Sequence, residues 1–149
     1  MANLFRSALA LAVLLLINPV WASDYGSADE AKAMLEKAVA AMQEDQEAAL
    51  AMFISGECGF KDRDLYVFCG GPDGNFTAHP KLVGKSLKDL KDKNDKAIGE
   101  EMYANAKEGE IVEVAYMWPR PGDDTTPVDK VAYVTMVGDQ LCAVGYYKQ

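Results

Sequence analysis

EIVEVAYMW, residues 110–118, decides the fold class, because its polarity changes with a period of two. The aliphatic and aromatic side chains at every second position from Val112 to Trp118 share one face of an extended chain. This pattern predicts a strand. Two more strands are predicted downstream at 128–137 and 141–147, with Gly138-Asp139 as the reversal between them. The C-terminal part of the chain therefore predicts an antiparallel sheet.

The upstream part combines helices with a hairpin. Residues 27–53 predict one long amphipathic helix that opens with a Ser27–Glu30 capping box and ends near Gly56. Residues 64–78 predict a hairpin around a glycine-rich turn, and a second, shorter helix is predicted at 96–107. Runs of helix and strand in this order indicate the α+β class.

Several short motifs follow one another along the chain in a specific order. They are GFKDRDLYVF at 59–68, DG at 73–74, AHP at 78–80, LVGK at 82–85, YMWP at 116–119, Lys130, and GYY at 145–147. Their order and spacing resemble the single Cache domain of type 2, a family of extracytoplasmic sensor domains, over about residues 31–148. The resemblance implies a PAS-like α+β fold, in which a long N-terminal helix packs on a five-stranded antiparallel sheet, with a short helical insertion between strands 2 and 3. It also implies a small-molecule pocket between sheet and insertion.

The N-terminus predicts export. Arg6 precedes an apolar run at 8–17, and Ala22 ends a small-residue cleavage pattern, so residues 1–22 are expected to be a signal peptide. The run is about half the roughly 20 residues that a membrane helix needs, although an uncleaved anchor is the alternative. Residues 23–149 would then form a single Cache domain, periplasmic or secreted, with no direct membrane span. We expect its signal to pass to a membrane-bound receptor or kinase.

Charge and motif content exclude several functions. The formal net charge is −8, which repels phosphate backbones, so nucleic acid is not expected as a partner. One histidine and no paired-cysteine spacing predict no metal site. No nucleophile motif is present, so we expect neither an enzyme nor a bound cofactor.

A binding site for a small organic ligand, of the carboxylate or amino acid class, is the leading hypothesis. Tyr116 and Trp118 share a strand face and could stack on the ligand, although they could equally be core. Lys130 could pair with a ligand carboxylate, or be a solvated edge residue. Tyr133 has the opposite parity to Lys130, so one of the two assignments conflicts with the other. His79 is expected to cap the turn after the hairpin, with pocket contact as the alternative.

The PAS-like strand order that the resemblance implies places Cys69 and Cys142 on neighbouring strands, which predicts a disulfide between them. A Cys58–Cys69 bond is the competing prediction. The alternative function is an accessory scaffold that docks its long helix on a membrane sensor, or self-associates, without binding a metabolite.

Overall fold

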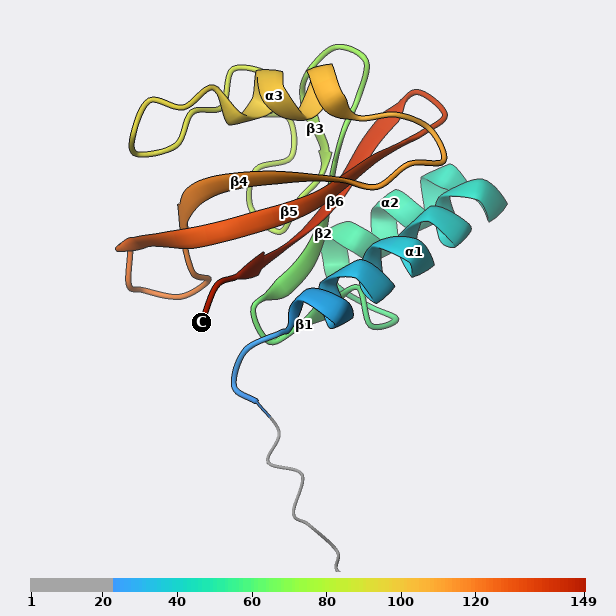
Figure 1. Ribbon diagram of the computed structural model, residues 1–149. Helices are drawn as coiled ribbons and strands as arrows, with labels where there is room; N and C mark the ends of the chain where they lie inside the picture. Colours follow the sequence, from blue (N-terminus) through green and yellow to red (C-terminus); the bar gives the residue numbers. More distant parts are fainter. Residues whose placement is uncertain (1–22) are drawn as a thin grey trace, which may run out of the picture.

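An antiparallel sheet separates two layers of the molecule (Figure 1). The computed structural model describes residues 23–149, and the predicted signal peptide lies outside the described residues. The sheet order is β1-β2-β6-β5-β4, with β3 paired to β2. The strands are β1 (Lys61–Asp62), β2 (Leu65–Gly70), β3 (Phe76–Ala78), β4 (Val112–Pro119), β5 (Pro127–Val137) and β6 (Gln140–Tyr147). The predicted α+β, PAS-like architecture is confirmed, and the sixth strand is the two-residue β1.

The long N-terminal helix is broken in two, which corrects the prediction of one helix over 27–53. α1 spans Ala28–Glu44 and α2 spans Gln46–Ser55. Asp45 between them has an extended backbone, with φ −154° and ψ 102°, and its side chain accepts a 3.0 Å hydrogen bond from the backbone N–H of Ala48. An aspartate that caps a new helix in this way competes with continuation of the old one.

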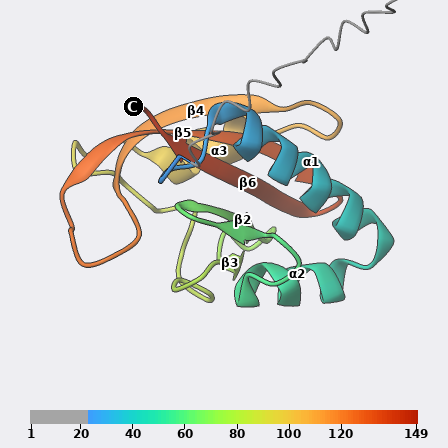
Figure 2. The same cartoon turned by 90° about the horizontal axis from the view of Figure 1, so that it is seen from below.

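The two ends of the helical segment match the sequence prediction. The Ser27 hydroxyl accepts from the Glu30 N–H at 3.2 Å, and the Glu30 carboxylate accepts from the Ser27 N–H at 2.8 Å. Gly56 ends α2 with φ 73°, a left-handed conformation that glycine adopts without a steric penalty. α1 lies across β6 and β5, and α2 turns to cover β2 and β3 (Figure 2).

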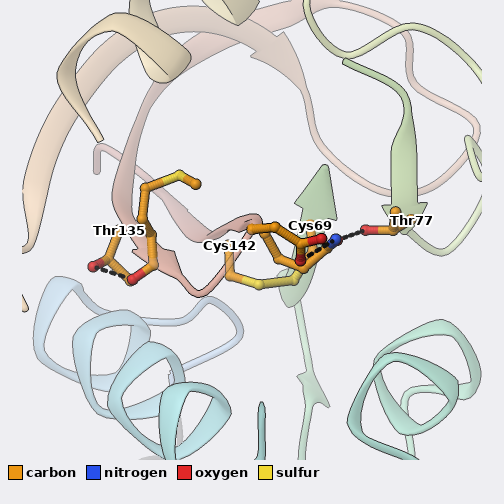
Figure 3. The surroundings of a disulfide bond; sticks show 7 residues. Cys69, Thr77, Thr135 and Cys142 are labelled. Carbon is orange, nitrogen blue, oxygen red and sulfur yellow. Dashed lines mark hydrogen bonds between the residues drawn. A yellow bond between two sulfur atoms is a disulfide. The ribbon is translucent and has the colours of Figure 1, made fainter. Parts of the chain in front are cut away.

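The predicted disulfide is present on the sheet face that the helices cover. Cys69 of β2 lies directly opposite Cys142 of β6, with a Cα–Cα distance of 4.1 Å (Figure 3). Both cysteines are fully buried in the core between α1 and the sheet. Cys58 is exposed and free, so the competing Cys58–Cys69 pairing is wrong.

The opposite face carries the insertion between β3 and β4. Its helix, α3 (Ile98–Asn105), is shorter than the predicted 96–107 and ends at a C-cap on Ala106. α3 packs tightly on the insertion: a Cβ added to Gly99 would lie 1.8 Å from the carbonyl oxygen of Leu87. The insertion and the sheet enclose a second apolar core.

The polar run at 89–95 protects the edge of the sheet. Asp92 Oδ2 accepts from the Met117 N–H at 3.1 Å, and its Oδ1 accepts from the N–H groups of Asn94 and Lys96. Lys96 Nζ donates to the Ala115 carbonyl at 2.5 Å. These contacts cover outward backbone groups of β4, which would otherwise be open to pairing with another chain. No helix among residues 23–149 is both long and apolar enough to cross a membrane.

Candidate ligand-binding site

A pocket of about 270 Å³ opens where α3 no longer covers the sheet. It lies between β2, the turn after β3, and residues 120–126 between β4 and β5, which we call the pocket loop. Small-molecule pockets typically measure roughly 300–1,000 Å³, so the space suits a ligand of a few heavy atoms. The uncharged lining includes Tyr66, His79, Pro80, Leu82 and Trp118, and the charged lining is Lys61, Lys81, Arg120 and Asp124.

His79 shapes the pocket wall. Its Nδ1 accepts hydrogen bonds from the N–H groups of Lys81, at 2.9 Å, and Leu82, at 3.2 Å, as expected of a turn cap. Burial, with the nearby charges of Lys130 and Lys81, lowers the pKa of His79 to about 4. The ring is therefore neutral at neutral pH, and an accepting Nδ1 places its proton on Nε2. His79 thus offers the pocket a neutral N–H donor.

Lys130 lies behind the pocket wall. Its side chain is 1% exposed, and Nζ donates to the hydroxyl oxygens of Tyr66 at 3.0 Å and Tyr147 at 3.3 Å. Nζ also lies 4.5 Å and 4.7 Å from the centroids of those two rings. Burial lowers the pKa of Lys130 to about 7, although the charge of Asp64 partly opposes the shift. The solvated-edge alternative is therefore wrong for this lysine.

Gly145 gives Lys130 the space to lie flat against β6. The two residues are on neighbouring strands, and a Cβ added to Gly145 would lie 2.3 Å from Lys130 Cε. A side chain at position 145 would displace the lysine stem. The glycine of the GYY motif therefore has a packing role beneath the buried amine.

Asp64 and Arg120 add an ion pair beside the pocket, between a buried carboxylate and a partly exposed guanidinium. Asp64 is 6% exposed, and its Oδ1 accepts from the Gly26 N–H at 2.7 Å. Its Oδ2 lies 3.7 Å from Arg120 Nε, and both of these buried atoms lack a hydrogen-bond partner among residues 23–149. The Arg120 guanidinium carbon lies 4.3 Å from the centroid of the Tyr25 ring and 4.9 Å from that of Tyr147.

Charge is unbalanced in this region. Arg120, and Lys130 when protonated, share one buried carboxylate, Asp64, and Lys61 and Lys81 add positive charge to the pocket lining. Asp124 is the one carboxylate among the lining residues of this pocket. Buried charges are tolerated when they are paired. An anion in the pocket would supply the missing negative charge.

The predicted site residues fall into four places. Trp118 and His79 line the pocket, and Lys130 lies behind Tyr66. Tyr116 is buried beneath α3, where the remaining space of about 10 Å³ has room for about one water at most. Tyr133 lies on the other face of the sheet, stacked on Tyr146 at a centroid distance of 5.7 Å. The structure therefore does not bring Tyr133 together with the other four.

Tyr66 and Arg120 were missed by the sequence reasoning, although parity could have found both. Tyr66 and Phe68 are two positions apart in β2, so alternation places both side chains on one face of the strand. Phe68 pairs with Ala143 of β6. Arg120 follows Trp118 by two positions, so an extended chain places both on one face. The prolines on either side of Arg120 predict only a loop at this point, and a loop has no strand parity. Within residues 23–149, no three histidine, cysteine or acidic residues are grouped closely enough to hold a metal ion.

Comparison with solved structures supports the fold. A methyl-accepting chemotaxis protein from Vibrio parahaemolyticus RIMD 2210633 is similar at 24% identity and a TM-score of 0.65, over 80% of this chain and 86% of that one. The periplasmic sensor domain of a chemotaxis protein is similar at 23% identity and a TM-score of 0.59, over 81% of this chain and 90% of that one.

A third similar structure is that of a Cache chemosensory domain described for carboxylic acid recognition, at 22% identity and a TM-score of 0.57, over 81% of this chain and 88% of that one. No curated protein sequence matches significantly. The sequence profile of the Cache domain matches residues 29–147, from the first turn of α1 to the end of β6. The chain therefore belongs to the Cache domain family of sensor modules.

Proposed function

We propose that this chain is a periplasmic or secreted sensor module that binds a small organic carboxylate in the pocket beside Trp118 and signals through a membrane-bound partner. The observation that carries the proposal is the excess of positive charge around an otherwise mostly apolar pocket. The carboxylic acid recognition described for one structural neighbour agrees with this chemistry.

Arg120 is the main carboxylate-binding group. Two aromatic rings fix its guanidinium, and it makes no hydrogen bond to any other described residue, so its terminal N–H groups remain free for a ligand. Arginine matches the geometry of a carboxylate with two parallel hydrogen bonds. The His79 Nε2–H can add a neutral donor, and Trp118 offers an apolar surface to the rest of the ligand.

The amino acid class differs from simple acids in one respect. A ligand ammonium group needs an acceptor, and Asp124 is the carboxylate that lines the pocket. Binding of alanine in preference to propionate would assign this role to Asp124. Preference for propionate would indicate that the lining cations and the apolar wall suffice.

Tryptophan fluorescence gives a direct test. Residues 23–149 contain a single tryptophan, Trp118, so its emission reports on the pocket alone. We expect propionate, succinate or alanine to change this emission and to raise the melting temperature. A ligand at 100 times its Kd raises the free energy of unfolding by about 2.7 kcal/mol. Arg120→Gln should weaken binding by about 10-fold or more, as a hydrogen bond to a charged group contributes about 1.5–3 kcal/mol.

Lys85→Gln is the matched control, since Lys85 is an exposed cation that does not line the pocket. It should bind as the wild type does. If no acid or amino acid changes either the emission or the melting temperature, the proposal fails. A scaffold that acts without a metabolite then becomes the better explanation.

A further inference from the structure

Residues 23–26, which we call the N-terminal strap, lead directly into the first turn of α1 and run beside β1 (Figure 1). Arg63, in the turn between β1 and β2, donates from Nη1 to the carbonyl oxygens of Ser23 at 3.2 Å and Tyr25 at 2.9 Å. The adjacent Asp64 accepts from the Gly26 N–H. The strap is therefore fixed to the sheet by two consecutive residues of one turn.

The same turn also reaches the pocket. Asp64 uses one carboxylate oxygen for the strap and directs the other toward Arg120, which lines the pocket. Tyr25 contacts Arg120 as well, through its ring. Two separate contacts, one ionic and one aromatic, thus connect the strap with the principal cation of the pocket.

Tyr25 is unusually exposed for a residue that contacts the principal cation of the pocket. It is 42% exposed, yet its ring is one of the two that contact the Arg120 guanidinium. Tyr147, the other ring, is fully buried and held by a 2.7 Å hydrogen bond from its hydroxyl to the Pro119 carbonyl. The core therefore supplies one of the two ring contacts, and the other is present only when the strap is docked.

We propose that Tyr25 is a positioning residue for the pocket, so that binding of a carboxylate at Arg120 and docking of the strap at the start of α1 favour each other. This inference rests on the proposed function. A docked strap holds the guanidinium ready, which reduces the cost of ordering it when the acid binds. Coupling of two binding events is reciprocal, so the acid must stabilise the docked strap by the same factor.

The strap is thereby a route for the signal out of the pocket. It is continuous with Ser27, whose capping box begins α1, and Arg63 also pairs with the Glu30 carboxylate of that box. A change in strap docking acts on the first turn of α1 through these contacts. A partner that contacts the N-terminal end of α1 could detect the change without touching the ligand.

The first test compares Tyr25→Ala with Tyr25→Phe, using propionate and succinate as probes and Trp118 emission as the readout. Tyr25→Ala should weaken binding about two- to fivefold, the equivalent of an exposed cation–π contact, and Tyr25→Phe should bind as the wild type does. Hydrogen exchange in the strap should become slower on addition of the acid in the wild type, but not in Tyr25→Ala. Unchanged affinity in Tyr25→Ala would overturn the inference.

The second test needs no ligand. Arg120→Gln should speed hydrogen exchange in the strap, and Tyr25→Ala should speed exchange in the pocket loop, whereas Lys85→Gln should change neither. If both effects appear but no acid binds, the proposed function fails and the connection between strap and pocket loop stands. If acids bind but the two segments exchange independently, the inference fails and the proposed function stands.

Discussion

Replacing Lys130 by methionine tests whether the buried amine imposes a pH-dependent cost on folding. Nζ contacts the hydroxyls and rings of two tyrosines, and no carboxylate of residues 23–149 lies within salt-bridge distance of it. Burial lowers the pKa of the folded protein's lysine to about 7, against 10.5 for an unperturbed side chain. Between those two values the unfolded chain binds more protons than the folded one.

The free energy of unfolding must therefore rise with pH over this range. Below pH 7 the amine is protonated in both states, and the full shift corresponds to a cost on the order of 5 kcal/mol. The cost is progressively relieved above pH 7, at up to about 1.4 kcal/mol per pH unit, which amounts to about 2 kcal/mol between pH 7 and pH 9. Tyr66 stays protonated throughout, because burial raises its pKa to about 12.

Urea unfolding of the oxidised protein at pH 7, 8 and 9 measures this slope. We expect the wild type and the surface control Lys85→Met to gain stability with pH, and Lys130→Met to be nearly independent of it. Loss of the two tyrosine hydrogen bonds would lower the stability of Lys130→Met by about 1 kcal/mol each at every pH, which leaves the slope unaffected. Equal slopes in the wild type and Lys130→Met would refute the reasoning.

Three further variants test the framework around the site by urea unfolding. Joint replacement of Cys69 and Cys142 by alanine should lower the free energy of unfolding by about 4 kcal/mol, because the bridge spans 73 residues, and an unchanged midpoint would contradict this. Gly99→Ala should cost about 2–3 kcal/mol, since its Cβ would overlap the Leu87 carbonyl oxygen, and near-neutrality would show that α3 moves freely. Ser27→Ala should cost about 1 kcal/mol through the lost helix cap, and a threonine at this position should restore most of it.

The strands could be predicted closely because their signals are local. The predicted strands at 128–137 and 141–147 differ from β5 and β6 by one residue each, since alternation and the Gly138-Asp139 turn act within a few positions. The break at Asp45 could not be predicted in the same way. No glycine or proline marks it, and an aspartate such as Asp45 is a weak signal because aspartate also occurs within helices. Packing of α2 on β2 and β3 adds a tertiary contribution that the helical periodicity does not contain.

The site shows the same division between local and tertiary information. Parity correctly placed Tyr116 and Trp118 on one sheet face, and the strand register, which the sequence does not contain, puts Lys130 opposite Tyr116 on the same face. Parity could not determine how deeply each side chain is buried, because burial depends on where the insertion ends. α3 and Leu87 cover Tyr116 and leave Trp118 at the pocket. Parity cannot show what holds Arg120 in place: its guanidinium contacts the rings of Tyr25 and Tyr147, which come from opposite ends of the described chain.

The position of Lys130 behind Tyr66 also makes a prediction about binding. A carboxylate held at Arg120 adds negative charge near a lysine whose pKa is about 7, so it favours the protonated amine. By reciprocity, propionate should bind more tightly at pH 6 than at pH 8 and should take up a fraction of a proton near pH 7. His79, with a pKa of about 4, and the acid itself do not titrate in this interval. Calorimetric titration in two buffers of different ionisation enthalpy measures the uptake, and Lys130→Met should abolish both it and the pH dependence. Persistence of either in that variant would assign the proton to another group.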